Sequence, residues 1–469
     1  MNPEQLAGAA QWLFLGYFVA VNGGYLLLYL SALAAVHRQL ESQMLEELPH
    51  AYSGLEPPVS ILVPAYNEEA TIATSVRSML QLDYPEFEVI VVNDGSRDAT
   101  MEALRSAFAL VPFAEAYRRR IAVKTVRGIY RSTRHPNLRV IDKENGGKAD
   151  ALNAGINASR FPLFCGVDAD SILERASLGR VVAPFLEDPT VIASGGTVRI
   201  ANGCTVRDGF LESVALPERL LPLLQIVEYL RAFLFGRMGW TPFNAVLIIS
   251  GAFGLFRKEV VVAAGGYRSD TVGEDMELVV RLHRLHRQSG KPYRVAFVPD
   301  PICWTEAPET LRVLRSQRTR WQRGLAESLT LNLGLPFSRR GGAPGWLAFP
   351  FMALFDWLGP VIEVAGYLLM ALGFAMGVVS GAAFGAFLLL AIGLGVALSV
   401  CALLLEEISF HIYKRPRDLA VLAAAALLEN FGYRQLIALW RLEGLARWAF
   451  GTKAHWGEMK RTAGWQKGV

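Results

Sequence analysis

Long apolar stretches lie toward both ends of the chain, and a mixed region lies between them. Residues 11–36 contain no Asp, Glu, Lys or Arg, and about 20 apolar residues are enough for a helix to cross a bilayer. A second apolar block, 346–405, contains only two charged residues. Its length predicts two spans, which we place at 346–373 and 379–405. The pattern therefore predicts a membrane protein with a central domain between hydrophobic helices.

Two further segments are apolar but carry polar residues. The segment 418–440 contains Glu429 and Arg434, so we favour an interfacial or re-entrant helix over a full transmembrane span. The run Leu220–Phe235 is interrupted by Glu228 and Arg231. It is either a buried helix or an amphipathic helix that lies on the membrane surface.

The basic residues predict how the chain is oriented in the membrane. No Lys or Arg precedes the first apolar stretch, which argues against a cleavable signal peptide, and Arg38 follows it. Arginines and lysines also flank the second block and recur through the tail, 441–469. Because positively charged loops stay in the cytoplasm, we expect the N-terminus outside and the central domain and the tail inside.

The central region, 57–310, alternates β-branched runs with helical patterns. Such alternation predicts a doubly wound, mostly parallel α/β sheet, inserted here between transmembrane helices. Ligands bind at the carboxyl ends of the strands of such a sheet. Neither a G-x-G-x-x-G nor a G-K-[ST] loop is present, so dinucleotide and P-loop sites lack support. The predicted strands are Val59–Val63, Phe87–Val92, Leu138–Ile141 and Pro162–Val167, with helices at 68–81 and 147–159.

The composition agrees with this division. Of 469 residues, 52% are hydrophobic and 19% are charged, against about 25% charged in soluble domains. The net charge of +4 is small, and we expect no nucleic-acid partner. The four cysteines form no C-x-x-C pair, which argues against a disulfide framework and fits a reducing compartment.

Asp168 and Asp170 follow a predicted strand. With one residue between them, both carboxylates can face the same side. Mg²⁺ binds one or two carboxylates together with phosphate oxygens, so the pair fits a metal–diphosphate site. Taken alone, the pair would equally suit a helix cap and a turn.

Three other charged residues have both an ordinary and a chemical interpretation. Asp94 lies in an Asn-Asp-Gly-Ser turn, and Lys148 begins a helix whose N-terminus could bind a nucleotide. Asp275, in Gly-Glu-Asp, is either an acidic residue that the helix dipole favours or a general base near a sugar hydroxyl.

The segment 311–342 is predicted to be a juxtamembrane helix that carries Gln317-Arg-Thr-Arg-Trp321. Arginine side chains bind phosphate oxygens in bidentate fashion, and the face of Trp321 offers a surface for a sugar ring. The alternative is a basic helix that contacts anionic membrane lipid.

The motifs, taken jointly and in this order, are far more specific than any one of them. The chain resembles the family 2 inverting glycosyltransferases of the processive synthase type, which make cellulose, hyaluronan, chitin and poly-N-acetylglucosamine. The likeness to the bacterial poly-N-acetylglucosamine synthases is strongest. The residues that carry the resemblance are Pro64–Glu68, Asn93–Ser96, Gly147–Asp150, Asp168–Asp170, Ser250–Phe253, Gly273–Asp275 and Gln317–Trp321.

The resemblance implies a GT-A fold and a set of site residues. Asp170 would bind Mg²⁺ or Mn²⁺, and Asp275 would be the catalytic base. The nucleotide-sugar, usually a UDP-sugar, would be held by Tyr66, Glu68, Asp94, Lys148, Asp168, Gln317, Arg318 and Arg320. The acceptor would meet Ser250, Gly251, Glu274 and Trp321.

The resemblance also implies a function. We expect extension of a β-linked polysaccharide from a UDP-sugar, N-acetylglucosamine or glucose, at the bacterial inner membrane by a multi-pass protein. One alternative is the transfer of one or a few sugars to a lipid carrier, and another is a non-catalytic protein that binds nucleotide-sugar or lipid. Cellulose and hyaluronan synthases carry more helices after the domain, which leaves room for an accessory subunit or a homo-oligomer to complete a secretion channel.

Overall fold

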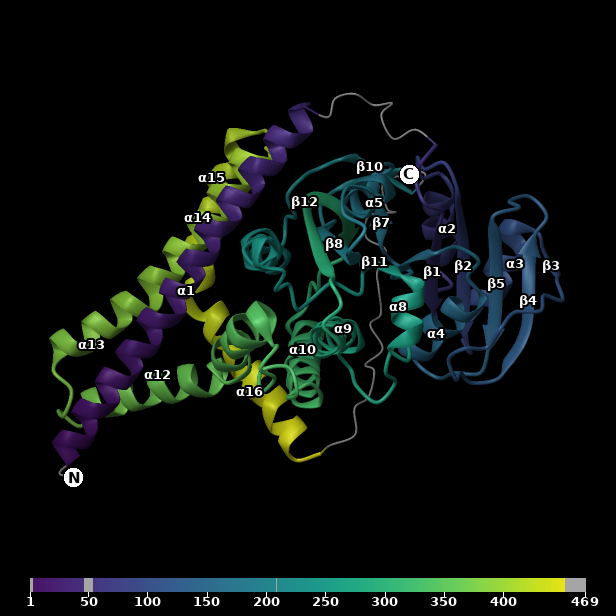
Figure 1. Cartoon of the computed structure of the whole chain (residues 1–469). Helices are drawn as coiled ribbons and strands as arrows, with labels where there is room; N and C mark the ends of the chain where they lie inside the picture. Colours follow the sequence, from purple (N-terminus) through teal and green to yellow (C-terminus); the bar gives the residue numbers. More distant parts are fainter. Residues whose placement is uncertain (1–2, 46–53, 208, 452–469) are drawn as a thin grey trace.

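The computed structural model describes residues 3–45, 54–207 and 209–451. A large sheet with helices on its faces occupies one side of the molecule, and long helices form the other side (Figure 1). Helices α9, α10 and α16 lie between these two parts (Figure 1).

The bounds of the elements follow chain order. The strands are β1 (Val59–Ala65), β2 (Phe87–Asp94), β3 (Leu110–Pro112), β4 (Val126–Ser132), β5 (Leu138–Lys143), β6 (Leu163–Val167), β7 (Ile172–Leu173), β8 (Val191–Ile200), β9 (Thr205–Arg207), β10 (Phe210–Ser213), β11 (Phe253–Arg257) and β12 (Arg294–Thr305). The helices of the domain are α2 (Ile72–Leu80), α3 (Thr100–Phe108), α4 (Lys148–Ala158), α5 (Ser177–Glu187), α6 (Leu220–Tyr229), η1 (Leu230–Phe235), α7 (Gly236–Met238), η2 (Thr241–Phe243), α8 (Lys258–Ala263), α9 (Glu274–Ser289) and α10 (Leu311–Leu331). The remaining helices are α1 (Pro3–Leu45), η3 (Pro344–Ala348), α11 (Phe349–Phe351), η4 (Met352–Trp357), α12 (Gly359–Ala375), α13 (Gly381–Leu388), η5 (Leu389–Gly393), α14 (Leu394–Ser409), α15 (Pro416–Leu428), η6 (Glu429–Tyr433) and α16 (Arg434–Ala449).

The main sheet has the strand order β3-β4-β5-β2-β1-β6-β11-β8-β12-β7. Strands β5, β2, β1 and β6 are parallel, and β8 is parallel to β12. Strand β11 lies antiparallel between β6 and β8, and the strands at both edges are also antiparallel. Because helices cover both faces, β1, β2 and β6 are apolar almost throughout. The predicted α/β alternation is confirmed, with strand bounds that shift by one or two residues.

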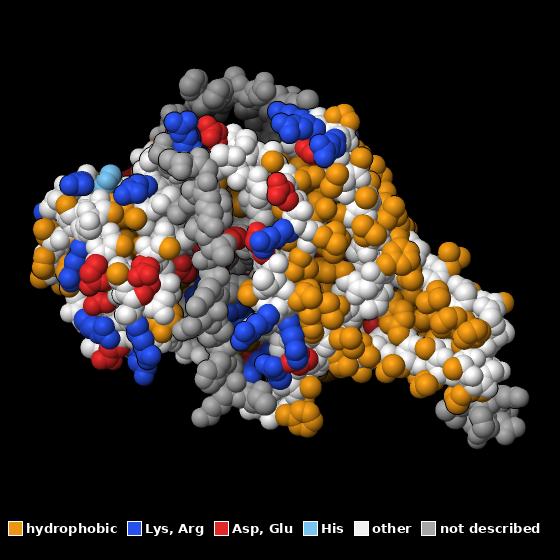
Figure 2. Space-filling model, turned by 180° about the vertical axis from the view of Figure 1, so that it is seen from behind, with side chains coloured by type: hydrophobic (Ala, Val, Ile, Leu, Met, Phe, Trp, Pro, Cys, Tyr) orange, Lys and Arg blue, Asp and Glu red, His pale blue; other side chains and the backbone are white. Residues whose placement is uncertain are grey.

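The long helices match the predicted hydrophobic segments. Two helices, Trp12–Arg38 and Gly381–Ser409, are long and apolar enough to cross a membrane. The pair Pro344–Trp357 and Gly359–Ala375 would form a further span, bent by 43°, where Pro360 interrupts the helical hydrogen bonds. Figure 2 shows hydrophobic side chains gathered over this side of the molecule.

The structure shows how the two ambiguous apolar segments fold. Helices α6 and η1 are largely buried and pack against β8, α14 and α15, which agrees with the buried-helix interpretation. The segment 418–440 is broken between α15 and α16, where Phe431 leaves helical geometry and Gly432 has φ 95°, a value that favours glycine. Of the predicted basic tail, 452–469 lies outside the described residues.

Candidate functional site

One cavity of about 1250 Å³ lies between the sheet and the long helices. All the residues proposed for nucleotide-sugar, metal, acceptor and base line it. They come from the ends of β1, β2 and β6, from the segment just before β11, from the starts of α4 and α9, and from the middle of α10. The structure thus brings together motifs that lie up to 255 positions apart, from Tyr66 to Trp321.

Asp94 ends β2 and organises the loop before α4. Its carboxylate accepts hydrogen bonds from the backbone N–H of Gly146 (3.0 Å) and Gly147 (2.7 Å) and pairs with buried Lys143. The Asn145 side chain also donates to the Asp94 carbonyl at 2.8 Å. These contacts fix the start of α4, so Asp94 determines where Lys148 lies.

Lys148 is the positive centre of the site. Its Nζ lies 2.6 Å from Asp168, 3.7 Å from Glu274 and 3.3 Å from the carbonyl of Gly251. Burial alone would lower the pKa of Lys148, but Asp168, Glu274 and Asp275 together raise it above its usual range. The ammonium is therefore charged at neutral pH.

Asp168 and Asp170 supply carboxylates to the cavity just after β6. Asp170 is only 6% exposed, whereas the Asp168 side chain is 30% exposed. Within the described ranges, no three acidic, His or Cys residues form a metal-binding group. The two carboxylates still fit a Mg²⁺ or Mn²⁺ that shares its coordination with a diphosphate, because such ions use few protein ligands.

Asp275 is held at the start of α9. Its Oδ2 accepts from the backbone N–H of Gly251 at 2.9 Å, and its Oδ1 accepts from Met276 N–H at 2.8 Å. A Cβ on residue 251 would lie 2.9 Å from Lys148 Nζ and 3.1 Å from Asp275 Oδ2. The absence of a side chain at Gly251 therefore leaves room for Lys148 and Asp275 to approach its backbone closely.

Glu274, next to Asp275, is 5% exposed. Burial raises the pKa of Glu274 to about 7; Lys148 opposes this rise and Asp275 adds to it. Glu274 therefore changes charge near neutral pH.

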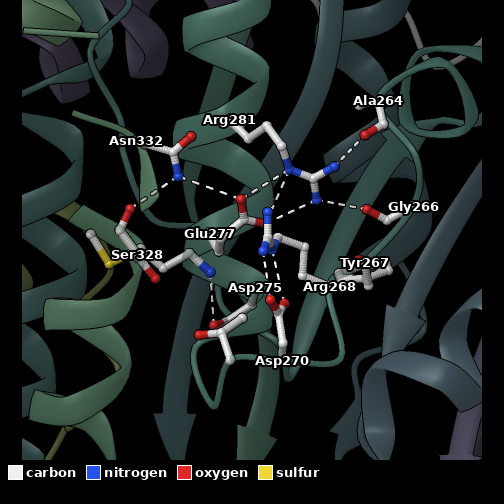
Figure 3. Close-up of polar contacts among 12 residues, drawn as sticks. Ala264, Gly266, Tyr267, Arg268, Asp270, Asp275, Glu277, Arg281, Ser328 and Asn332 are labelled. Atoms are coloured by element: carbon white, nitrogen blue, oxygen red, sulfur yellow. Dashed lines mark hydrogen bonds and ion pairs between the residues drawn. The ribbon is translucent and has the colours of Figure 1, made fainter. Parts of the chain in front are cut away.

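The first turn of α9 is fixed by α10. Gly273 and Gly324 touch, so a Cβ on residue 273 would lie 2.8 Å from the Gly324 carbonyl oxygen. Ser328 Oγ donates to the Gly273 carbonyl at 3.2 Å. Farther along α9, Glu277 and Arg281 form an ion pair at 2.9 Å. Figure 3 shows this pair between Asn332 and the carbonyls of Ala264 and Gly266. This packing sets α10 against the donor site.

Arg320 and Trp321 present different groups to the cavity. Burial lowers the pKa of the Arg320 guanidinium, while the charges of Glu274, Asp168 and Asp275 act in the opposite direction. Arg320 therefore lies in the field of the acidic residues around the donor site. Trp321 is 45% exposed, so part of its ring is open for contact.

The structure gives Arg318 other partners than the predicted diphosphate. Its side chain is 2% exposed, its Nη2 donates to Glu228 Oε2 at 2.7 Å, and its Nη1 donates to Gln317 Oε1 at 2.8 Å. The guanidinium also lies 4.2 Å from the centroid of the Trp321 ring. The fork of donors is thus engaged within the protein, and Gln317 is engaged with it.

Sequence reasoning missed several residues of this cavity. Arg237, in α7, lines it with a buried Nη1 that has no hydrogen-bond partner among the described residues. Burial lowers the pKa of Arg237 to about 10, against the pull of Asp275. In the sequence, the only sign that Arg237 belongs to this cavity was its position within a mostly apolar stretch.

The cavity also continues among the long helices. There its lining is rich in polar side chains, and some of them are paired, as in the 3.1 Å hydrogen bond from Tyr25 to Asp356. The polar residues of this part are Asn22, Tyr25, Asp356, Glu363, Tyr367, Arg434, Gln435 and Arg441. Apolar side chains such as Phe18, Leu28 and Phe355 also line this part.

Comparison with protein families and curated sequences gives consistent matches. The model of a family described as "Glycosyltransferase like family 2" matches residues 57–324. A poly-β-1,6-N-acetyl-D-glucosamine synthase of Staphylococcus aureus is 31% identical over 274 residues, which cover 58% of this chain and 55% of that protein. The synthase of the same name from Staphylococcus epidermidis is 27% identical over 313 residues, with coverages of 66% and 65%. The chain thus spans less than two thirds of the length of these curated relatives.

A solved structure has the same fold over nearly the whole chain. The mannosyltransferase PcManGT from Pyrobaculum calidifontis, in complex with GDP-Man and Mn²⁺, matches with a TM-score of 0.59 at 18% identity. The match covers 95% of this chain and 100% of that one. At this identity the likeness concerns the fold alone, and it confirms the predicted GT-A type α/β sheet.

Proposed function

Because the chain belongs to glycosyltransferase family 2, we propose that it is a membrane-bound inverting glycosyltransferase that extends a β-linked polysaccharide from a UDP-sugar. The observation that carries the proposal is that a single cavity holds the donor-site residues, Asp275 and Trp321 and then continues among the long helices. The names of the curated relatives favour N-acetylglucosamine as the sugar, with glucose as the alternative.

Asp275 is the general base in this proposal. Two backbone N–H groups orient its carboxylate, and it lies beside Lys148 at the donor end of the cavity. It removes the proton of the acceptor hydroxyl as that oxygen attacks the anomeric carbon opposite the diphosphate. A single displacement of this kind converts an α-linked donor into a β-linked product. The base must lie within hydrogen-bond reach of the hydroxyl.

Lys148 and Arg320 stabilise the departing diphosphate. Both are cations whose neighbours are the site carboxylates, and fixed charges act strongly in a site that excludes water. Mg²⁺ or Mn²⁺, when bound at Asp170 with the diphosphate, supplies further positive charge to the leaving group. Tyr66 and Glu68, after β1, lie along the same cavity and complete the nucleotide end.

The acceptor lies between Trp321 and the helical part of the cavity. The exposed face of Trp321 receives a sugar ring, and Ser250 and Gly251 border its path. The polar lining among the long helices then accommodates sugars already added. This continuation favours polysaccharide extension over transfer of a single sugar to a lipid carrier.

The same arrangement supports a position at the cytoplasmic face of the bacterial inner membrane. The catalytic domain adjoins helices long and apolar enough to span, and basic residues lie at both flanks of the second apolar block. Activity would then use cytoplasmic nucleotide-sugar and deliver product into the membrane.

A panel of donors tests the function. Membranes that contain the protein are incubated with UDP- and GDP-sugars and Mg²⁺ or Mn²⁺, and nucleotide release and product mass are measured. We expect release from one UDP-sugar and a ladder of long products, with loss of both when a chelator is added. Single-sugar lipid products would support the lipid-carrier alternative, and absence of release with every donor would contradict enzymatic function.

A further inference from the structure

Glu228 in α6 connects the acceptor tryptophan to the long helices. Its Oε2 accepts hydrogen bonds from Arg318 Nη2 and from the Tyr433 hydroxyl, both at 2.7 Å. Arg318 belongs to α10 and Tyr433 ends η6. One carboxylate oxygen of α6 therefore contacts two other segments, which lie 90 and 205 positions farther along the chain.

Arg318 transmits this contact to Trp321. Its guanidinium covers the indole at 4.2 Å from the ring centroid, and Tyr229, the neighbour of Glu228, packs beside the indole at 6.4 Å between ring centroids. Trp321 still exposes 45% of its surface. Glu228 thus fixes one side of the ring through Arg318 and leaves the other side open to the cavity.

Electrostatic attraction stabilises the contact between Glu228 and Arg318. Burial alone would raise the pKa of Glu228, but Arg318, Tyr433 and Arg231 bring it below its usual value. The pKa of Arg318 is raised above its usual value, because the attraction of Glu228 outweighs its burial. Both groups remain ionised at neutral pH, and charge-assisted pairs of this kind are strong and directional.

A second ion pair lies one helical turn farther along. Arg231 pairs with Glu429 and donates to Ser399 Oγ at 2.9 Å. Glu429 begins η6 and Tyr433 ends it, so two polar contacts from α6–η1 hold the broken turn at both ends. Because this pair shares the bend with Tyr433, the control is taken from a partly exposed pair outside the Glu228 contacts: Arg315 of α10 and Glu443 of α16, 2.8 Å apart.

We propose that Glu228 is a positioning residue for the acceptor: through Arg318 it sets the orientation of the Trp321 ring, and through Tyr433 it ties that orientation to the bend between α15 and α16. The proposal rests on the proposed function, since it assigns the open face of Trp321 to an acceptor sugar. We assign Glu228, which also lines the cavity, no contact with the donor or the reacting atoms. Its loss should therefore weaken acceptor binding more than donor binding.

The test separates the acceptor KM from the donor KM. Short β-linked oligosaccharides of the donor sugar serve as acceptors for the wild type, Glu228→Gln and the control Glu443→Gln. We expect Glu228→Gln to raise the acceptor KM about tenfold, as loss of one hydrogen bond to a charged group implies, and to leave the donor KM within about twofold. Glu443→Gln removes a partly exposed ion pair between α10 and α16, and we expect it to leave the acceptor KM unchanged.

Two further variants keep the test informative if Glu228→Gln does not fold. Glu228→Asp retains the charge and should restore part of the acceptor affinity, whereas Tyr433→Phe removes one hydroxyl and should raise the acceptor KM by a smaller factor. An unchanged acceptor KM in every folded Glu228 and Tyr433 variant would overturn the inference. Equal rises in Glu228→Gln and Glu443→Gln would also overturn it, because they would indicate a general loss of packing between α10 and α16. A wild type without acceptor-dependent transfer would instead refute the proposed function.

Discussion

At the scale of single residues, the site depends on close approaches that allow little substitution. Gly251 is the clearest case, because its missing side chain lets Lys148 and Asp275 meet at one backbone position. The sequence indicated that Gly251 belongs to a motif, but it could not indicate what the glycine must accommodate, since that depends on residues 103 positions before it and 24 after it.

Gly251→Ala should lower kcat by about a hundredfold, since displacing a catalytic group by about 1 Å can cost that much. Stability should change little, because the crowded atoms include the flexible end of Lys148. Gly179→Ala is the control, as a Cβ there meets nothing within 4 Å. Nucleotide-release rates and thermal midpoints measure both effects, and full activity of Gly251→Ala would contradict the described geometry.

Glu274 predicts a pH effect on stability. Burial raises the pKa of Glu274 from 4.5 to about 7 in the folded protein, so between these values the folded state binds a proton that the unfolded state has released. The stabilisation is complete below pH 4.5 and is lost as the pH rises through about 7. We expect Glu274→Gln to flatten the fall in thermal midpoint from pH 5 to 8. A parallel fall in both proteins would contradict the assignment.

For Asp94 and Arg318, the sequence predicted a place in the site but not the contacts that each residue makes. Both were assigned to the nucleotide by resemblance, and both line the cavity. The structure adds that Asp94 holds the loop before α4 and that Arg318 holds Trp321. The contacts of Asp94 with Lys143 and Gly147 could not be predicted, because these residues meet only when the sheet has formed. The contact of Arg318 with Glu228 could not be predicted either, because it forms only when α6 has packed.

At the scale of elements, hydrophobic periodicity predicted the central strands and the helices between them. It worked because β1, β2 and β6 are buried on both faces and are therefore mostly apolar. It did not predict that β11 is antiparallel, since direction depends on how the chain returns after α7. It also could not decide whether α6–η1 is buried in the protein or lies on the membrane surface, because both kinds of helix share the same apolar composition.

The crossing of α9 and α10 is the element contact on which the site relies most. Gly324→Ala would place a Cβ 2.9 Å from Gly273 Cα, and such overpacking costs about 1–3 kcal/mol. We expect a lower thermal midpoint and a loss of activity as Trp321 moves relative to Asp275. Gly334→Ala is the matched control, since its Cβ would meet only side-chain atoms at 3.5 Å. Equal behaviour of the two variants would show that the crossing tolerates change.

At the scale of the whole molecule, the sheet domain is attached to the long helices by buried ion pairs. Arg199 in β8 and Glu406 in α14 are 2.5 Å apart, and each side chain is 3% exposed. The apolar pattern predicted both parts of the molecule but not this attachment, because the paired residues are 207 positions apart.

Glu406→Gln should destabilise the attachment by about 3–5 kcal/mol, because it leaves the Arg199 charge buried without its counter-ion. The double variant Arg199→Leu/Glu406→Leu should recover part of that loss, since it buries no lone charge. Thermal unfolding in detergent measures both. A double variant less stable than Glu406→Gln alone would indicate that the pair itself is strongly stabilising.

The central claim is that Asp275 acts as the base in a cavity shared by donor and acceptor. The most direct measurement compares Asp275→Asn with the wild type for UDP affinity and for the rate of sugar transfer. Asparagine can still accept the Gly251 hydrogen bond, so UDP should bind within about twofold, while transfer should fall at least about a hundredfold for loss of a general base. Transfer at the wild-type rate by Asp275→Asn would contradict the account.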